Sequence, residues 1–158
     1  MRNTKRIRLY AIVLALALTL SAIPLYSALA ADAGHIVLFS DVTDDTEKSY
    51  LETVSGAPGD KITVYIPILN QNLENATDIN CNLSVSTDTS VFPFSAGETD
   101  TALAASRLKK WDATNEELVS WDGSLAIGER AYFKMDATLL STLTAGGYTL
   151  PFTITYSD

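Results

Sequence analysis

Two tryptophans, Trp111 and Trp121, lie ten positions apart, and an aspartate follows each of them. An exposed indole beside a carboxylate offers a stacking surface and hydrogen-bond acceptors, which suits the face of a pyranose ring. Trp111 comes directly after two lysines and is expected to be the exposed ring. Trp121 is in phase with Val119 and is expected in the core, where a β-sandwich commonly buries one tryptophan. The sequence therefore offers Trp111 and Asp112 as a carbohydrate-binding site.

A second group of candidate ligands lies towards the N-terminus, in the segment DVTDDTEKS. Carboxylate oxygens are ligands that Ca²⁺ prefers, and this short segment is rich in them. Their spacing does not follow the D-x-D-x-D-G frame of an EF-hand loop. A solubilising acidic linker is the preferred interpretation, and a calcium site is the alternative. The candidate ligands are Asp41, Asp44, Asp45 and Glu47, and the sequence suggests no other cofactor.

Patterns of catalytic residues are weak. The only histidine, His35, would need a nucleophile and an orienting acid beside it to form a triad. Ser106 and Lys109 have the S-x-x-K spacing of penicillin-recognising enzymes, but the companion S-D-N and K-T-G elements are absent from the sequence. Glu116 with Glu117, or either of them with Asp112 or Asp122, could form a glycosidase pair, although adjacent strand residues point to opposite faces. We therefore expect no enzymatic activity.

Residues 1–30 have the composition of a cleaved secretory signal peptide. Basic residues near the start are followed by the apolar run AIVLALALTL, and Ala28 and Ala30 supply the small side chains that signal peptidase requires. Cleavage is expected after Ala30, and the protein is expected to be secreted and associated with the cell surface. The alternative is an uncleaved anchor, because Leu9 to Ala31 is long enough to span a bilayer.

Removal of residues 1–30 would make the chain strongly acidic. The full sequence has eleven Lys and Arg against nineteen Asp and Glu, and four of the basic residues but none of the acidic ones lie in residues 1–30. Residues 31–158 therefore hold seven basic and nineteen acidic side chains, a formal charge of −12. A chain of this charge repels phosphate backbones, so we expect no nucleic-acid partner.

Apolar side chains alternate with polar ones along much of the remaining chain, which predicts β-strands. In DINCNLSVS, the residues Ile79, Cys81, Leu83 and Val85 are expected on the inner face, so the only cysteine is interpreted as a core residue. We predict an all-β fold, an Ig-like antiparallel β-sandwich of about six to eight strands that follows the cleaved signal peptide. The pattern is strong at 61–69, 78–86, 130–139 and 148–156, and weaker at 35–40 and 117–122.

The predicted sandwich occupies residues 55–158, after an acidic segment at 31–54 that could hold a first strand. Residues 95–117 break the alternation and are expected to be an excursion between strands. Pro67 and Pro151 cannot donate a ladder hydrogen bond, so each is expected at a sheet edge or beside a bulge.

The stretch APGDKITVYIPILNQNLENATDINCNLSV resembles the opening of the CARDB and S-layer-associated Ig-like domains of bacterial and archaeal surface proteins. Those domains have Pro-Gly-Asp, an alternating strand, a polar turn and a second alternating strand. The ending LAIGERAYFKMDATLLSTLTAGGYTLPFTITYSD is similar to the ending of the same family. The resemblance covers about 55–94 and 125–158 and implies a non-catalytic extracytoplasmic module, without assigning any binding residue.

These observations predict a secreted, non-enzymatic module of the cell envelope that acts in adhesion, scaffolding or accessory protein–protein contacts. Its expected partners are other envelope or extracellular proteins, and after cleavage it would have no membrane span. Sandwiches of this kind bind through loops at their ends or through an exposed sheet edge. The alternative function is carbohydrate binding through Trp111.

Overall fold

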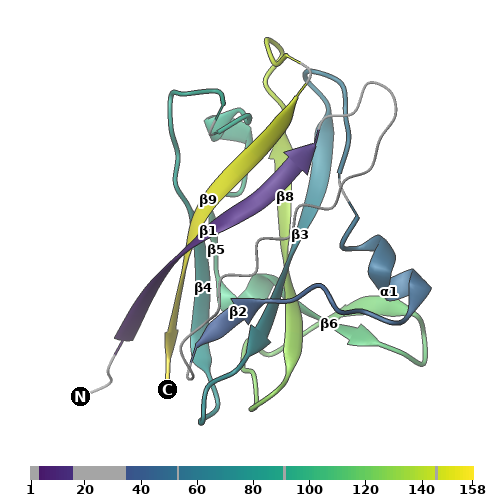
Figure 1. Cartoon of the computed structure of the whole chain (residues 1–158), viewed down its shortest axis with the longest axis vertical. Coiled ribbons are helices and arrows are strands. Elements are labelled where there is room, and N and C mark those ends of the chain that lie inside the picture. The colour runs from purple at the N-terminus through teal and green to yellow at the C-terminus, as the bar shows by residue number, and fades with distance from the viewer. Residues whose placement is uncertain (1–3, 16–34, 53, 91, 145) are drawn as a thin grey trace.

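The computed structural model describes residues 4–15, 35–52, 54–90, 92–144 and 146–158. Two antiparallel sheets face each other (Figure 1), which confirms the predicted all-β, sandwich-like fold. One sheet has the strand order β1 (Thr4–Ala15), β9 (Gly147–Ser157), β4 (Thr77–Leu83) and β5 (Ala102–Leu103). The other has the order β2 (Ile36–Leu38), β3 (Lys61–Asn70), β8 (Arg130–Thr138), β6 (Leu108–Asp112) and β7 (Glu117–Ser120).

The core lies between the sheets and is built from the alternating residues of the four longest strands after residue 35. Each of these strands sends every second side chain inward, as the pleat of a β-strand requires. Ile62 is the partly buried member at the start of β3. The buried members are Val64, Ile66 and Ile68; Ile79, Cys81 and Leu83; Ala131, Phe133, Met135 and Ala137; and Tyr148, Leu150, Phe152, Ile154 and Tyr156.

Val85 is the exception, because the sequence predicted it to be buried and it is 54% exposed. The N–H of Ser84 donates to the carbonyl of Pro151 at 2.9 Å, but Pro151 has no N–H to return the bond. The ladder between β4 and β9 ends here, and β4 stops at Leu83. The chain therefore leaves the sheet before Val85. A register shift in the β1–β9 pairing also begins at Pro151, so the predicted irregularity is present.

Pro67 lies on β3 just past the point where the neighbouring strand β2 ends. The N–H of Asn70 donates to Glu129 and its carbonyl accepts from Gly128, so both groups face β8. Backbone groups alternate in direction along a strand, which turns those of Pro67 towards β2. Because β2 ends at Leu38, opposite the residue that follows Pro67, the proline occupies the edge position that its missing N–H requires.

Residues 95–117 are more regular than the predicted excursion. They contain two 3₁₀ turns, η1 (Ala96–Glu98) and η2 (Ala105–Arg107), and the strands β5 and β6. Strand β6 joins the five-stranded sheet between β8 and β7. Its two lysines interrupt the alternation of apolar residues, so this strand was not predicted from the sequence. The turn after β6 places Glu116 at φ 53°, and Asp112 accepts hydrogen bonds from Thr114 and Asn115 there.

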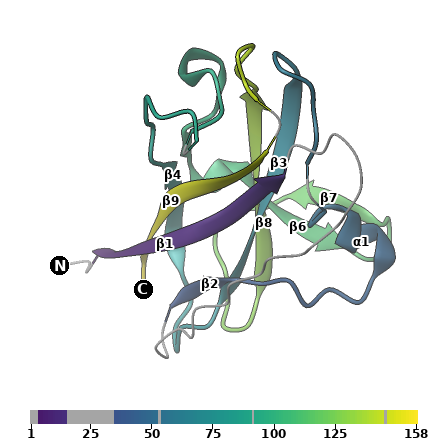
Figure 2. The ribbon, with the colours of Figure 1, turned by 45° about the horizontal axis from the view of Figure 1, so that its top comes forward.

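A short outer layer covers the five-stranded sheet on the face away from the core. It is formed by residues 39–52, which include helix α1 (Asp45–Ser49), and Figure 2 shows it beside β6 and β7. The ring of Tyr50 contacts Tyr65 and Trp111 edge-on, with centroid distances of 5.0 and 6.0 Å. The ring of Phe39 lies 5.3 Å from that of Tyr132. These contacts attach the outer layer to β3, β6 and β8.

The segment interpreted as the front of a signal peptide forms strand β1, which runs beside β9 (Figure 1). The pairing starts at Thr4 opposite Ser157 and continues to Ala15 opposite Gly147. The predicted cleavage residues Ala28 to Ala30 lie outside the described residues, so cleavage stays a prediction. Within the described ranges, we find no helix long and apolar enough to cross a membrane.

Candidate functional site

The predicted carbohydrate site is not assembled in the way the sequence suggested. Trp111 is partly buried and packs against Tyr50 of the outer layer. Trp121 is 37% exposed, so the expectation that it lies in the core is wrong. The pairing of β6 with β7 fixes the face of each indole, because Trp111 lies opposite Leu118 and the N–H of Trp121 bonds to Leu108. The two indoles therefore lie on opposite faces of the hairpin.

Polar partners already occupy the surroundings of Trp121. The amine of Lys110 lies 3.3 Å from the centroid of the ring, within the range of a cation–π contact. The same amine is 2.6 Å from the carboxylate of Glu129. The indole N–H donates to the carbonyl of Ser124 at 2.5 Å. Asp112, the other residue proposed for sugar binding, lies on the face opposite Trp111, and hydrogen bonds from Thr114 and Asn115 lower the pKa of its carboxyl.

The acidic segment at 41–47 attaches the outer layer to the sheet. The carboxylate of Asp44 accepts from the N–H groups of Thr46 and Glu47 at 2.9 Å and caps α1. Glu47 accepts from the hydroxyl of Tyr132 at 2.6 Å, and Asp41 pairs with Arg130 at 3.0 Å. Three of the four candidate calcium ligands, Asp41, Asp44 and Glu47, thus already bond to other groups of the protein. Within the described parts of the chain, no three His, Cys, Asp or Glu residues are grouped so that they could hold a metal ion.

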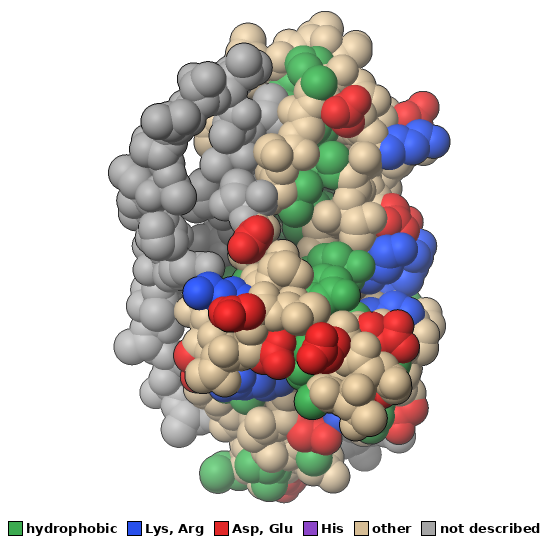
Figure 3. All heavy atoms as spheres, turned by 90° about the vertical axis from the view of Figure 1, so that its right-hand side faces the viewer, with side chains coloured by type: hydrophobic (Ala, Val, Ile, Leu, Met, Phe, Trp, Pro, Cys, Tyr) green, Lys and Arg blue, Asp and Glu red, His purple; other side chains and the backbone are tan. Residues whose placement is uncertain are grey.

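Tyr132 is fully buried although it points away from the core. Residues Phe39 and Glu47 of the outer layer cover it. Burial raises the pKa of Tyr132, and the hydrogen bond to Glu47 raises it further. The phenol therefore remains protonated and able to donate to Glu47. Figure 3 views this side of the molecule, where acidic side chains gather over the lower half of the face.

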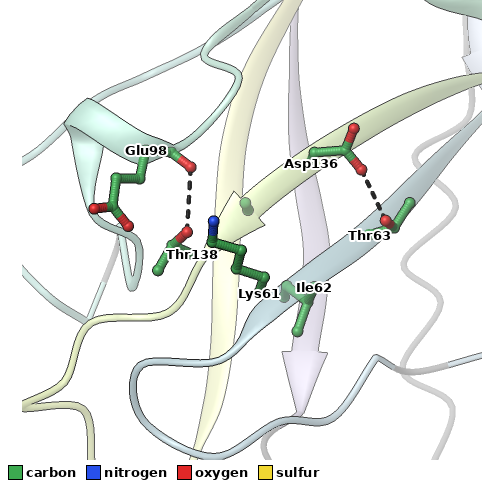
Figure 4. A pocket seen from close by; sticks show the side chains of 7 residues that line it. Lys61, Ile62, Thr63, Glu98, Asp136 and Thr138 are labelled. Atoms are coloured by element: carbon green, nitrogen blue, oxygen red, sulfur yellow. Dashed lines mark hydrogen bonds between the residues drawn. The ribbon is translucent and has the colours of Figure 1, made fainter.

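An open depression of about 510 Å³ lies at the start of β3 and the end of β8 (Figure 4). The hydroxyl of Thr63 donates to Asp136 at 2.8 Å, and the hydroxyl of Thr138 donates to the carbonyl of Glu98 at 3.4 Å. Lys61 lines the depression between these pairs (Figure 4). Five of the seven lining residues are polar or charged, and all seven come from β3, β8 and the turn η1.

Asp136 is the centre of an ionic network at this depression. Its carboxylate lies 3.3 Å from Lys134 and 3.7 Å from Arg107, and Arg107 also pairs with Asp100 at 3.0 Å. The hydrogen bond from Thr63, together with the two nearby cations, lowers the pKa of Asp136. The carboxylate is therefore ionised at neutral pH and poorly suited to act as a general acid or base there. It joins β3, β8 and η2 instead.

The edge of β9 is the candidate docking surface. At the ends of the two sheets, β5 has two residues, β2 has three and β7 has four. Strand β9 has eleven residues, GYTLPFTITYS, and none is charged. Exposed edges are usually short or protected by Lys, Pro or bulges, because their free N–H and C=O groups pair with other strands. In the full chain, the strand β1 covers this edge.

The direction of the backbone groups of β9 follows from its contact with β4. The carbonyl of Pro151 accepts from Ser84 and so faces β4. Because these groups alternate along a strand, those of Phe152 and Ile154 face the opposite side, towards β1. Their partners in β1 are Leu9 and Ile7. Removal of residues 1–30 would therefore expose these N–H and C=O groups.

Comparisons of the chain with protein-family models, with curated proteins and with solved structures find no match. The resemblance to CARDB domains therefore stays a prediction.

The β9 edge was not among the sites predicted from the sequence, although a signal for it was present. The terminal strand was predicted from its alternation, but its neighbours in the sheet were not. A run of eleven uncharged residues in a chain so rich in carboxylates is the feature that points to a protected edge. Only the strand order shows that β1 is its neighbour on that side.

Proposed function

We propose that the chain is the precursor of a secreted, non-enzymatic module of the cell envelope that binds another protein by strand addition at β9. The observation that carries this proposal is the uncharged, eleven-residue β9, which would become an outer strand once residues 1–30 are removed. Strand addition supplies affinity through main-chain hydrogen bonds and specificity through alternate side chains. This places the contact at a sheet edge and leaves the core unchanged.

The composition of residues 1–30 and the charge of residues 31–158 support export. The first thirty residues have a basic start, an apolar run and an A-x-A ending, the three parts of a signal peptide. The acidic residues 31–158 would favour solubility outside the cell. The resemblance to CARDB and S-layer-associated domains favours the same location.

Export is tested by expressing the full chain in a secreting bacterium and measuring the intact mass of the product in the medium and the envelope. The expected product begins at Ala31. The matched control is Ala30→Phe, which places a bulky side chain at the cleavage position and should leave the precursor intact. Retention of residues 1–30 in both proteins would overturn the proposal of a cleaved leader.

Binding and catalysis are tested on the exported product. The exported chain should capture envelope proteins. A peptide, a glycan and peptidoglycan offered to it as substrates should remain uncut. Turnover of any of them would contradict the non-enzymatic assignment. On a glycan array, binding that is lost in Trp111→Ala and kept in Trp121→Ala would instead favour the carbohydrate alternative.

A further inference from the structure

We infer that the β9 edge accepts one antiparallel strand with a basic start and an apolar continuation, and that β1 occupies this place in the precursor until the leader is cut. The inference rests on the proposed export and names the kind of partner segment that the edge would bind. The occupant in the structure is the segment TKRIRLYAIVLA. This segment occupies the position that the partner strand would take, so its chemistry indicates what the edge can bind.

The pairing between β1 and β9 is long enough to define such a site. Partners run without interruption from Thr4 opposite Ser157 to Tyr10 opposite Pro151, and pairing resumes at Val13 opposite Thr149. The irregularity falls beside Pro151 on β9. A partner strand would therefore meet a regular section next to Ser157 and an irregular section next to Gly147. This polarity fixes both the direction and the register of the added strand.

Charge favours a basic occupant. Strand β1 contains Lys5, Arg6 and Arg8 and no acidic residue. The rest of the protein, residues 31–158, carries a formal charge of −12, while β9 itself is uncharged. A basic strand is attracted by the field of the whole acidic domain and meets no opposing charge along β9. A second copy of the exported chain would be repelled by the same field.

The connection through the leader explains how the precursor would be kept inactive. A strand tethered to its own binding site competes at an effective concentration of about millimolar. A partner strand in solution rarely reaches that concentration, so the intact precursor would reject it. Cleavage after Ala30 makes the leader a separate peptide, which dilution or membrane retention would remove. Processing would therefore both release the protein and open the β9 edge.

The test uses the full chain with a site for a specific protease inserted between Ala30 and Ala31. The chain is purified folded, and one half is cut. A fluorescent peptide with the sequence of residues 4–15 is added to both halves, and its anisotropy is measured. We expect saturable binding to the cut chain and at least about tenfold weaker binding to the uncut chain, because the tethered strand competes there.

Two N-methylated peptides provide a matched control that changes only the backbone. N-methyl groups on Ile7 and Leu9 remove the N–H groups expected to bond Ile154 and Phe152 and should weaken binding about tenfold. N-methyl groups on Arg6 and Arg8 face away from β9 and should have a smaller effect. Equal effects of the two peptides, or equal binding to cut and uncut chain, would overturn the inference.

The outcomes separate this inference from the proposed function. If the chain keeps its leader in the secreting bacterium but the cut chain binds the peptide, the edge site stands and the proposed processing fails. If the leader is removed in the bacterium but the cut chain does not bind the peptide, the strand-acceptor inference fails. Size-exclusion chromatography of the cut sample followed by native mass spectrometry shows whether residues 1–30 have left the site, so a blocked edge is distinguished from an inert one.

Discussion

Cys81 lies in the core between two strands, opposite Leu103 on β5 and Ile154 on β9. It is fully buried, and burial raises the pKa of its thiol to about 12. The reactive form of cysteine is the thiolate. The side chain is therefore protected both by its position and by its protonation, and it acts as a small apolar residue of the sandwich.

We predict that Cys81 resists alkylation as long as the protein is folded. Iodoacetamide at pH 8 should label it at least about a hundredfold more slowly in native buffer than in 6 M guanidinium, as measured by intact mass. Cys81→Ala is the control and should show no labelling in either condition. Equal rates in the two conditions would mean that the β4–β9 region opens readily.

Asp136 acts through its charge, which the pH dependence of stability can reveal. Because the hydrogen bond from Thr63 and the nearby cations lower its folded pKa, its contribution is present above the unfolded pKa of about 4 and is lost as pH falls through the lower folded value. The carboxylate is half exposed, with 47% of the side chain accessible. Screening by solvent therefore limits the contribution to about 1 kcal/mol.

We predict that Asp136→Asn lowers the melting temperature by about 2–4 °C at pH 7, and that the difference shrinks below pH 4. Differential scanning calorimetry from pH 7 to pH 2.5 would measure it. Asp88→Asn is the matched control, because hydrogen bonds from Ser90 in the same loop also lower the pKa of Asp88 without joining separate strands. A pH-independent loss for Asp136→Asn would contradict the ionic assignment.

At the residue scale, the alternation of apolar residues predicted which side chains form the core. It could not predict polar contacts between residues far apart in the chain. Cys81 was placed in the core because it is in phase with Ile79 and Leu83. The pairing of Glu47 with Tyr132 joins residues far apart in the chain, and single-sequence patterns contain no information on such pairs. Trp121 was misplaced because its phase with Val119 indicates a face of the strand and not how far the sheet covers that face.

At the scale of elements, the outer layer of residues 39–52 depends on a few polar contacts. Helix α1 has five residues and none of them is buried. A helix of this length is unstable alone. Its position therefore depends on the bond between Glu47 and Tyr132, the pairing of Asp41 with Arg130 and the ring contacts of Tyr50.

We predict that Tyr132→Phe loosens α1 and leaves the sandwich intact. Loss of the hydrogen bond to Glu47 should cost about 1–2 kcal/mol and move Tyr50 away from Trp111. In a Trp121→Phe background, fluorescence of Trp111 should then become more accessible to acrylamide, with an unchanged β-type circular dichroism spectrum. Asp45→Asn, an exposed substitution on the same helix, is the control. Unchanged quenching in Tyr132→Phe would show that the ring contacts alone hold the layer.

The positions of the strands were easier to predict from the sequence than the pairing between them. The four strongly alternating segments and both weaker ones are strands in the structure. Strand β6 was missed because Lys109 and Lys110 interrupt the apolar pattern, and their side chains bond to Ser120 and Glu129. Strand order was not predictable, because it depends on which edges pair across loops and not on the period of any one segment. The candidate docking edge follows from that order.

The whole molecule separates charge along the chain, with a basic segment at residues 1–30 and an acidic remainder at residues 31–158. This separation suits the proposed precursor, which would hold β1 on β9 and reject other copies of itself. If residues 1–30 are removed as proposed, two acidic domains would repel each other, which would oppose the edge-to-edge association that a long uncharged strand invites. A basic partner strand meets attraction in place of repulsion. Salt screens both effects, so the two modes of binding should respond to salt with opposite signs.

We predict that raising salt from 0.05 to 0.5 M weakens binding of the residue 4–15 peptide to the cut chain by about three- to tenfold, while self-association of the cut chain strengthens. Anisotropy measures the first and sedimentation velocity the second. A peptide with Lys5→Gln, Arg6→Gln and Arg8→Gln is the control and should bind more weakly, with little dependence on salt. If binding of the basic peptide were equally insensitive to salt, recognition would rest on the backbone ladder and apolar contacts alone. The acidic charge of the sandwich would then serve to keep copies of the protein apart and would have no part in choosing the partner.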